Sequence, residues 1–439
     1  MRGIIRVASI AFPVRFPGMD RSMWAVLAGT FTLRFSTGLT GAMLGVYLAQ
    51  LPDHGGPRVD PIVVGIFSAT FFLAELILSP IFGILSDRLG HHRVMLYGPA
   101  FGAIAVILTG LTTNLVVLGG TRWLEGASTA ASVPSILGFI AIVTASDAGL
   151  RGKMSARFEG ATLLGIGLGF AVAPIAFAVL GPVAFFANAV MYGVSFAIFW
   201  TVADPAGESN AVRAPHVGFG RYLDLIRSSH VWLLAPTWIA VNASIGLWFS
   251  QSIFQFAKAN PDFPEQVLMR GFSAIQISGA AVVIGVVFGL GLLYSGNRFK
   301  NMRRTTIILY GILGGGALVA AGIVVNHADG LPIAAVLGAA AVAGFGLFVL
   351  AGATPAALGL LADISERFPH DRGAIMGLYS VFLAVGQITG ALIGGYAAHA
   401  RGIDGMLVAT AILLAVALLP LSQLRRDEDA LTEAPETVS

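Results

Sequence analysis

The chain contains no cysteine and very little charge. Of its 439 residues, 11% are charged and 56% are hydrophobic. The absence of cysteine excludes disulfides, thiolate metal sites and cysteine nucleophiles. The scarcity of charge excludes a water-soluble globule, because so few polar residues cannot cover the surface of a protein of this size. The composition therefore predicts a membrane protein.

The sequence also lacks the short motifs that carry catalysis or nucleotide-driven pumping. It contains no P-loop, no HExxH and no GxSxG segment, which argues against a hydrolase, a metalloprotease or an ATP-driven transporter. We therefore expect a chain that is not an enzyme and that binds no cofactor and no metal. The formal net charge of +3 reflects membrane topology and does not indicate a nucleic-acid partner.

Long apolar stretches are what the sequence has in abundance. Each is roughly 20 residues or more, enough for a helix to cross a hydrocarbon core of ~30 Å. The sequence predicts an all-α polytopic membrane protein with twelve transmembrane helices. The predicted spans are 23–49, 61–82, 94–113, 115–143, 156–180, 182–203, 230–257, 271–294, 305–325, 331–360, 373–398 and 403–423.

Lysine and arginine are distributed unevenly between the two sides of these spans. Most of them lie in the N-terminal segment, the C-terminal tail and the loops on the same side, whereas the opposite loops hold only Arg58, Lys258, Arg270 and Arg401. Positively charged loops stay in the cytoplasm. We therefore expect both termini to be cytoplasmic and the chain to be a multi-pass protein of the cell (inner or plasma) membrane.

A long polar stretch divides the chain into six predicted spans plus six. The division predicts a cytoplasmic or interfacial N-terminal segment, two six-helix bundles, a cytoplasmic loop between them and a disordered cytoplasmic tail. Their boundaries are 1–22 for the first segment, 23–203 and 230–424 for the bundles, 204–229 for the loop and 425–439 for the tail.

The two halves also share a pattern of small residues. Gly169 and Gly386, and Ala173 and Gly390, are separated by the same 217 positions in the fifth and eleventh spans, which favours duplication. Small residues let helix backbones approach closely where lipid provides no hydrophobic drive. We expect packing or hinge roles for Gly126, Gly165, Gly169, Pro174, Gly386, Gly390 and Gly394.

The segment GILSDRLGHHR, residues 83–93, follows the second predicted span. Its pattern Gly83-x-Leu85-x-Asp87-Arg88-x-Gly90-x-x-Arg93 resembles the loop signature G-x-L-x-D-R-x-G-R-[RK] of the major facilitator superfamily. The resemblance extends over the whole chain, through twelve spans and the division into six plus six. It implies the fold of that family, two pseudo-symmetric bundles of six helices, and the function of a secondary transporter.

The resemblance also implies a gating role for this loop. In the family the acid bridges toward the eleventh helix and holds the cytoplasmic side closed, which would direct Asp87 to the backbone near Arg372 and Gly373. A carboxylate there is favourable because the free amides of a helix N-terminus carry about half a positive charge. The expected gating residues are Gly83, Asp87, Arg88, Gly90 and Arg93; topology alone also accounts for the arginines.

Four charged side chains lie deep inside predicted spans, Arg34, Glu75, Arg122 and Glu125, and Glu159 lies near the inner end of the fifth span, within reach of the headgroups. Each costs about 2.5–3.5 kcal/mol on insertion scales, so each needs a partner, a cavity or a function. Arg122 and Glu125 share a helix face, within a stretch that resembles the superfamily pattern R-x-x-Q-G with Glu in place of Gln. Two hypotheses remain open for this pair: a proton-coupling site or a static ion pair that fixes the bundle.

Arg34 has two interpretations as well. If it pairs with Glu75, it is structural or part of a proton path; if it faces the central cavity unpaired, its planar fork suits an anionic group. We favour the pair.

The C-terminal half is polar without being charged inside its spans. Aromatic and amide side chains there suit an amphipathic substrate held by stacking and a few hydrogen bonds. The alternative is that they join neighbouring helices by hydrogen bonds worth about 1 kcal/mol or less. The expected cavity residues are Trp238, Asn242, Trp248, Gln251, Tyr379 and Gln387.

Together these patterns predict a secondary active transporter that moves a small organic solute by alternating access. Protons are the expected coupling ion, efflux the expected direction, and a monomer in the lipid bilayer the expected state. The fifth span only loosely resembles the family's antiport motif, because Ala173 stands for its second glycine. A non-transporting receptor or assembly factor on the same scaffold, and a lipid flippase, are the alternatives.

Overall fold

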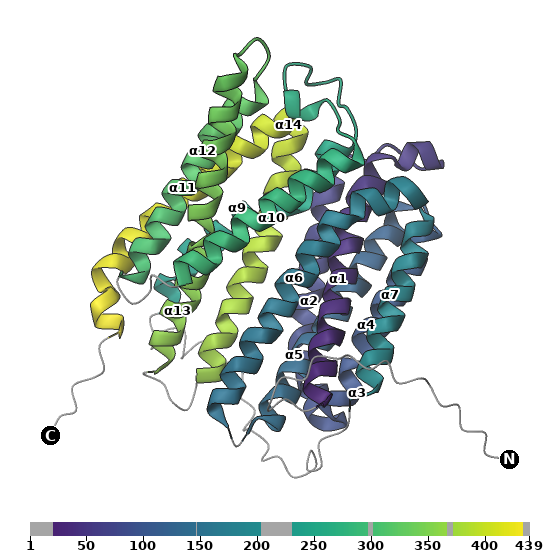
Figure 1. Ribbon diagram of the computed structural model, residues 1–439, viewed down its shortest axis with the longest axis vertical. Helices are drawn as coiled ribbons and strands as arrows, with labels where there is room; N and C mark the ends of the chain where they lie inside the picture. Colours follow the sequence, from purple (N-terminus) through teal and green to yellow (C-terminus); the bar gives the residue numbers. More distant parts are fainter. Residues whose placement is uncertain (1–20, 146, 203–230, 297–301, 367–371, 433–439) are drawn as a thin grey trace.

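The computed structural model describes residues 21–145, 147–202, 231–296, 302–366 and 372–432, and every regular element within them is a helix (Figure 1). Ten stretches are long and apolar enough to cross a membrane. One of them, in α14 (Arg372–Thr432), contains two passes because Arg401 and Gly402 are non-helical. With α1 (Arg21–Ala49), the described ranges make the twelve predicted passes.

The other passes follow the chain in order. They are α2 (Pro61–Leu89), α3 with α4 (His91–Met95 and Tyr97–Gly110), α5 (Leu115–Val143), α6 (Ala148–Leu180), α7 (Val183–Trp200), α9 (Ala235–Ala257), α10 (Ala274–Gly296), α11 (Arg304–Asn326) and α12 with α13 (Ile333–Ala351 and Ala353–Glu366).

Helices α2 and α6 extend well beyond the predicted apolar spans. The polar turns at their ends remain helical: α2 continues to Leu89, and α6 begins at Ala148, where the Asp147 carboxylate accepts a hydrogen bond from the Leu150 amide at 2.9 Å. Such a cap satisfies one of the free amides of the first turn. These two apolar spans, predicted from hydropathy, are therefore shorter than the helices that contain them.

The helices have a common inner end and a common outer end. We call the end at which α1 begins and α14 finishes the inner end, and the opposite one the outer end (Figure 1). At the outer end, α2 begins with Asp60, whose Oδ1 accepts from the Ile62 amide at 2.8 Å, and with Pro61 as its first residue. Both features are typical of helix starts.

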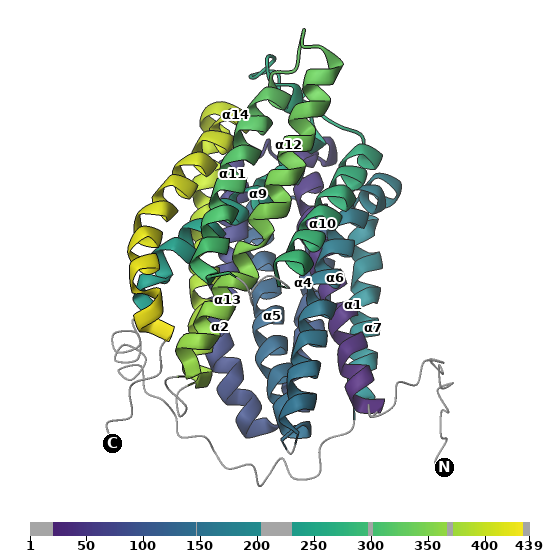
Figure 2. The same ribbon diagram turned by 60° about the vertical axis from the view of Figure 1, so that its left-hand side comes forward.

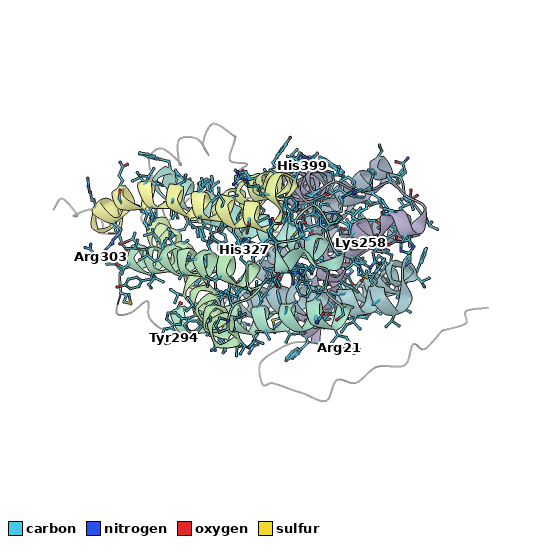
Figure 3. The ribbon with its side chains drawn as sticks, turned by 90° about the horizontal axis from the view of Figure 1, so that it is seen from above. Arg21, Lys258, Tyr294, Arg303, His327 and His399 are labelled. Carbon is cyan, nitrogen blue, oxygen red and sulfur yellow. The ribbon has the colours of Figure 1, made fainter. Side chains whose placement is uncertain are left out.

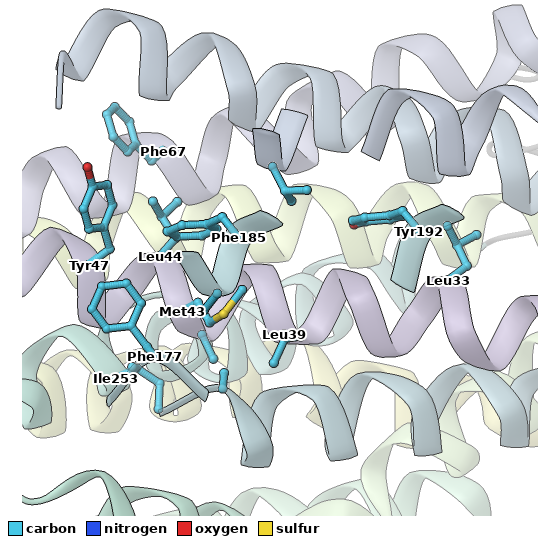
Figure 4. Close-up of a cluster of buried hydrophobic side chains, with 14 of the residues drawn as sticks. Leu33, Leu39, Met43, Leu44, Tyr47, Phe67, Phe177, Phe185, Tyr192 and Ile253 are labelled. Carbon is cyan, nitrogen blue, oxygen red and sulfur yellow. The ribbon is translucent and has the colours of Figure 1, made fainter. Parts of the chain in front are cut away.

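Each half of the chain has its own hydrophobic core. The N-terminal core includes Met43, Tyr47, Phe177 and Phe185 from α1, α6 and α7, together with Ile253, which reaches it from α9 (Figure 4). A second core is built from α9, α11, α13 and α14. The purple-to-blue and the green-to-yellow helices accordingly form two groups that lie side by side in Figure 1 and partly overlap in the turned view of Figure 2. This confirms the predicted all-α architecture of two bundles.

Small residues bring corresponding helices of the two halves together. A Cβ on Gly169 of α6 would clash with the Phe35 carbonyl oxygen of α1, and a Cβ on Gly390 of α14 would clash with the Ala243 carbonyl oxygen of α9. The same helix pair therefore packs backbone to backbone in each half. The offset of 217 pairs Gly169 with Gly386, and a Cβ on Gly386 would lie 2.8 Å from the Ile239 carbonyl oxygen in the same contact of α14 with α9.

The C-terminal tail departs from the prediction of disorder over 425–439, because α14 continues to Thr432. Glu428 is buried and accepts hydrogen bonds from the Arg304 amide, at 3.0 Å, and from the Thr305 hydroxyl. A carboxylate at the N-terminus of α11 is favourable and holds the last turns of α14 in place. The prediction is wrong for 425–432; residues 433–439, the segment 1–20 and the central loop 204–229 lie outside the described residues.

Gly169→Ala tests the close packing of α6 on α1. The added methyl group would collide with the Phe35 carbonyl, so we expect a loss of about 1–3 kcal/mol of stability, the usual cost of overpacking. Thermal unfolding of the purified protein in detergent measures it.

Gly167→Ala on the same helix is the matched control. Its Cβ would meet nothing within 4 Å, so the substitution should be neutral or slightly stabilising. Equal unfolding temperatures for the two variants would contradict the packing.

Candidate functional site

A buried ion pair lies in the middle of the N-terminal bundle. The Arg122 guanidinium donates to Glu125 Oε2 one turn along α5, and the two residues are 8% and 2% exposed. The Arg122 guanidinium also lies over the Phe71 ring of α2, 4.8 Å from its centroid. Gly126 makes this contact possible, because a side chain there would collide with the Phe71 backbone.

The second carboxylate oxygen of Glu125 has no hydrogen-bond partner. Glu125 Oε1 is buried and unpaired in the described part of the chain. An unsatisfied charged oxygen in an apolar setting is costly, and binding a proton removes the cost. Glu125 therefore combines a partner that favours its charge with a free oxygen that favours protonation.

Arg34 of α1 lies next to this pair. It is 8% exposed, and its Nη1 donates to the Thr129 hydroxyl at 3.4 Å. Thr129 follows Glu125 by one helical turn, about 5.4 Å. Arg34 also interacts electrostatically with Glu75 of α2 and Glu159 of α6. Among the described residues, Arg34 and Glu75 form no direct salt bridge. The positive charge of Arg34 therefore attracts the carboxylates of both Glu75 and Glu159 without direct contact to Glu75.

The loop between α2 and α3 has the turn that its glycine predicts. Gly90 has φ of +95° and its amide donates to the Ser86 carbonyl at 3.0 Å; a side chain would be strained at this φ. Asp87 is exposed, with its Oδ1 3.7 Å from Nε2 of His91. The helix N-terminus expected opposite Asp87 begins at Arg372, but the side chains around it lie outside what the structure describes. Arg88 and Arg93 are exposed, and Gly83 faces Pro134 of α5.

Four of the six predicted cavity residues lie together where α9 packs on α14. Trp238 stacks on Tyr379, with ring centroids 5.3 Å apart, and its buried Nε1 has no partner in the described ranges. Asn242 Nδ2 donates to the Trp238 carbonyl at 2.9 Å, and Gln387 lies against Gly246. Trp238 is 1% exposed, so this group is a buried aromatic contact that contains an unused hydrogen-bond donor.

The other two predicted cavity residues have different partners. Trp248 Nε1 donates to the Thr410 hydroxyl at 2.9 Å and joins α9 to the second pass of α14. Gln251 Nε2 donates to the Pro61 carbonyl at 2.9 Å and joins the two halves at the outer end. For these two the contacts fit the alternative interpretation, hydrogen bonds between helices.

Two features escaped the sequence patterns. Asn188 of α7 is fully buried, and its Nδ2 donates to the Thr40 hydroxyl at 2.8 Å and to the Ser36 carbonyl at 3.0 Å. A lone buried amide has no recognisable spacing. At the outer end, Arg58 and Lys258, which stood out only as exceptions to the charge rule, form ion pairs with acids of the other half.

Known proteins resemble the chain over most of its length. Residues 26–364 match the model of a family described as Major Facilitator Superfamily. The "Quinolone resistance protein NorA" of Staphylococcus aureus (strain MSSA476) is 24% identical over 390 residues, which cover 86% of this chain and 90% of the relative. The "Multidrug resistance protein 1" of Bacillus subtilis (strain 168) is 26% identical over 338 residues, covering 76% and 79%.

Solved structures of transporters share the fold. A bacterial homologue of the human lysosomal transporter Spinster aligns with a TM-score of 0.71 at 13% identity, covering 95% of this chain and 100% of that one. The nucleoside transporter NupG aligns with a TM-score of 0.68 at 14% identity, with the same coverage. At such identities the likeness establishes the fold alone.

Arg122→Met tests whether Arg122 compensates the buried charge of Glu125. Removing one member of a buried pair leaves the other uncompensated, so we expect a loss of about 3–5 kcal/mol in unfolding free energy. The double variant Arg122→Met with Glu125→Leu should lose much less, because neither charge remains. Denaturant unfolding in detergent measures the interaction free energy between the two side chains. If the losses in unfolding free energy of the two substitutions simply add, the two groups do not interact.

Proposed function

The chain belongs to the Major Facilitator Superfamily, a family of membrane transporters of small solutes, and from this premise we propose that it exports an amphipathic organic solute in exchange for protons. The observation that carries the proposal is the buried Arg122–Glu125 pair with its unpaired carboxylate oxygen. An exchanger needs one group that binds either a proton or an internal cation, and Glu125 beside Arg122 is such a group.

Further ionisable groups extend from this pair toward the inner end. Arg34 lies one turn away on the inner side of Glu125, and the carboxylates of Glu75 and Glu159 interact with it. Intramembrane charges that are linked in this way are typical of proton relays. We assign these groups to the proton path, and Glu125 to its proton-binding step.

The solute site is assigned to the two bundles' facing surfaces, with Trp238 and Tyr379 as its aromatic wall. Stacked rings bind flat apolar groups, and the free Trp238 Nε1 offers one directional hydrogen bond. Asn242 and Gln387 border the same place. The names of the relatives, quinolone resistance and multidrug resistance proteins, support efflux of organic compounds as the direction of transport.

The remaining assignments concern gating and topology. Asp87 is proposed to reach the N-terminus of α14 when the inner end closes, with Gly90 providing the turn. The inner end is assigned to the cytoplasm of the cell membrane, because most lysines and arginines belong to its loops. Neither assignment requires a second copy of the chain, and we propose a monomer.

Glu125→Gln tests the coupling role. Glutamine keeps the shape and cannot ionise, so solute exchange should persist while solute-driven proton flux falls to the level of protein-free vesicles. The assay is internal pH in proteoliposomes as pools of organic cations, organic anions and neutral sugars are added outside. Unchanged proton flux in this variant would remove Glu125 from the coupling step.

Glu428→Gln is the matched control. Glu428 is equally a buried carboxylate, but both of its oxygens accept hydrogen bonds at the start of α11, outside the proposed path. Coupling should survive this substitution. If no solute pool changes internal pH in the parent protein, proton-coupled export is rejected, and lipid movement and protein binding test the flippase and receptor alternatives.

A further inference from the structure

Three ion pairs join the two halves at the outer end. On the N-terminal side all three partners come from the link between α1 and α2, and on the C-terminal side they come from the start of the α9–α10 link and from α14. The pairs are Asp53 with Lys258 at 3.0 Å, Arg58 with Asp262 at 3.4 Å, and Asp60 with His399 at 2.6 Å. Figure 3, seen from the outer end, places Lys258 and His399 at the border between the two groups of helices.

The pairs lie above a tightly packed contact between the halves. Beneath them, a Cβ on Gly65 of α2 would collide with the Ala391 carbonyl oxygen, and Gly45 of α1 lies against Ile253 of α9. Asp60 has a second role, because its other oxygen caps α2. The link is thus fixed to the helix that packs on α14.

The inner end has a different character. Among the described residues, no ion pair connects the halves there: Asp87 is near His91 of its own half, and Arg304 pairs with Asp363 of its own half. Between described residues, the ion pairs that join the halves therefore lie at the outer end. The ion pairs and the packed contact beneath them close the outer end in this conformation.

We propose that Asp53–Lys258, Arg58–Asp262 and Asp60–His399 form an ionic clasp that holds the outer end shut, and that the charge of His399 makes the clasp sensitive to external pH. The inference rests on the proposed function in one respect: each cycle of export must open the outer end and therefore break these ion pairs.

Weak pairs suit a closure that must open repeatedly. All six side chains are at least 40% exposed, and an exposed pair contributes little by itself and is screened by salt. Three pairs acting together can still shift the balance between closed and open states. A buried pair of the same geometry would be too costly to break in every cycle.

The direction of the pH effect follows from the charges near His399. Asp60 faces it from α2, and Arg401 and Asp404 follow it on α14, where Asp404 pairs with His327. Other ionisable groups at this end are Asp53, His54, Arg58, Lys258, Asp262 and Glu265. Histidine is the side chain that changes charge near neutral pH. As external pH rises, His399 loses its positive charge, its attraction to Asp60 falls, and the outer end opens more often.

Ile253 offers a reporter for opening. It is 5% exposed beneath the clasp, and the chain has no native cysteine, so Ile253→Cys is the only thiol of such a variant. A membrane-impermeant maleimide added outside labels this cysteine when the outer end opens. Leu331→Cys, in the exposed outer loop before α12, provides the reference rate that corrects for thiol chemistry at each pH.

Charge reversal tests the contacts directly. In the reporter background, Asp53→Lys or Lys258→Asp should raise the corrected labelling rate about two- to fivefold, and the two together should restore it, because the swapped charges attract again. Neutralising all three pairs should raise it on the order of tenfold. A swap that does not restore the rate, or a triple neutralisation that leaves it unchanged, would overturn the clasp.

Asp329→Asn is the matched control. Asp329 and Arg270 form an exposed pair at the same end, within the C-terminal half. The hydrogen bond from Arg270 lowers the pKa of Asp329, so this pair stays charged over the range assayed. Loss of the Arg270–Asp329 pair should not change the labelling rate of Ile253→Cys. If the rate instead rises as much as in the clasp variants, removing any charge at the outer end has the same effect and the clasp is not specific.

His399→Gln tests the pH response. Between external pH 6 and 8 the corrected labelling rate should rise in the parent and remain flat in the variant, whereas His54→Gln should keep the rise. A rise that persists without His399 would overturn its assignment. Because labelling requires no solute, a clasp that behaves as expected in a protein that moves none of the solute pools would reject only the proposed function.

Discussion

A bilayer supplies no water to satisfy a polar group, and the structure follows from this one constraint. Every backbone amide must be paired within its own helix, so the chain can cross only as helices, and each charge that remains inside must have a reason to stay. The N-terminal bundle meets the requirement by grouping its charges: Arg122 pairs with Glu125, and Arg34 adjoins them through Thr129. Within this group, Oε1 of Glu125 has no hydrogen-bond partner in the described ranges, and the proposed proton-binding step is assigned to it for that reason.

Lipid is as apolar as the helix surfaces, so there is no hydrophobic attraction between helices in the bilayer. The helices must therefore be held together by close packing of complementary surfaces. Glycines supply it where α6 meets α1 and where α14 meets α9, because only a residue without a Cβ lets the facing backbones approach so closely. Each pair lies within one half, and each half is built around a hydrophobic core of its own, to which α9 adds Ile253 on the N-terminal side. Rigid halves are what a rocking mechanism needs, since motion then concentrates at their interface.

The parts that the sequence reveals are those with a period or a motif. Apolar length locates the helices and the loop around Asp87 identifies the family, while the distribution of lysine and arginine predicts the orientation. Partners between distant residues have no such signature: nothing in the sequence links Trp248 to Thr410, Gln251 to Pro61 or Lys258 to Asp53. The helical tail was missed for a related reason, because the charged residues after 424 look unstructured until Glu428 is seen to cap a helix more than a hundred residues away.

The strengths of the interactions are ordered as alternating access requires. The polar contacts inside the N-terminal bundle are buried and costly to break, as with Arg122–Glu125 or the side chain of Asn188 between α7 and α1. Ionic contacts between the halves are exposed, short and individually weak. Had the strong pairs joined the halves, the molecule would be trapped in one state; had the weak ones held the bundles, each half would deform instead of moving as a unit. Placing ionic contacts at the rim and buried charge inside one bundle allows the protein to rearrange without unfolding.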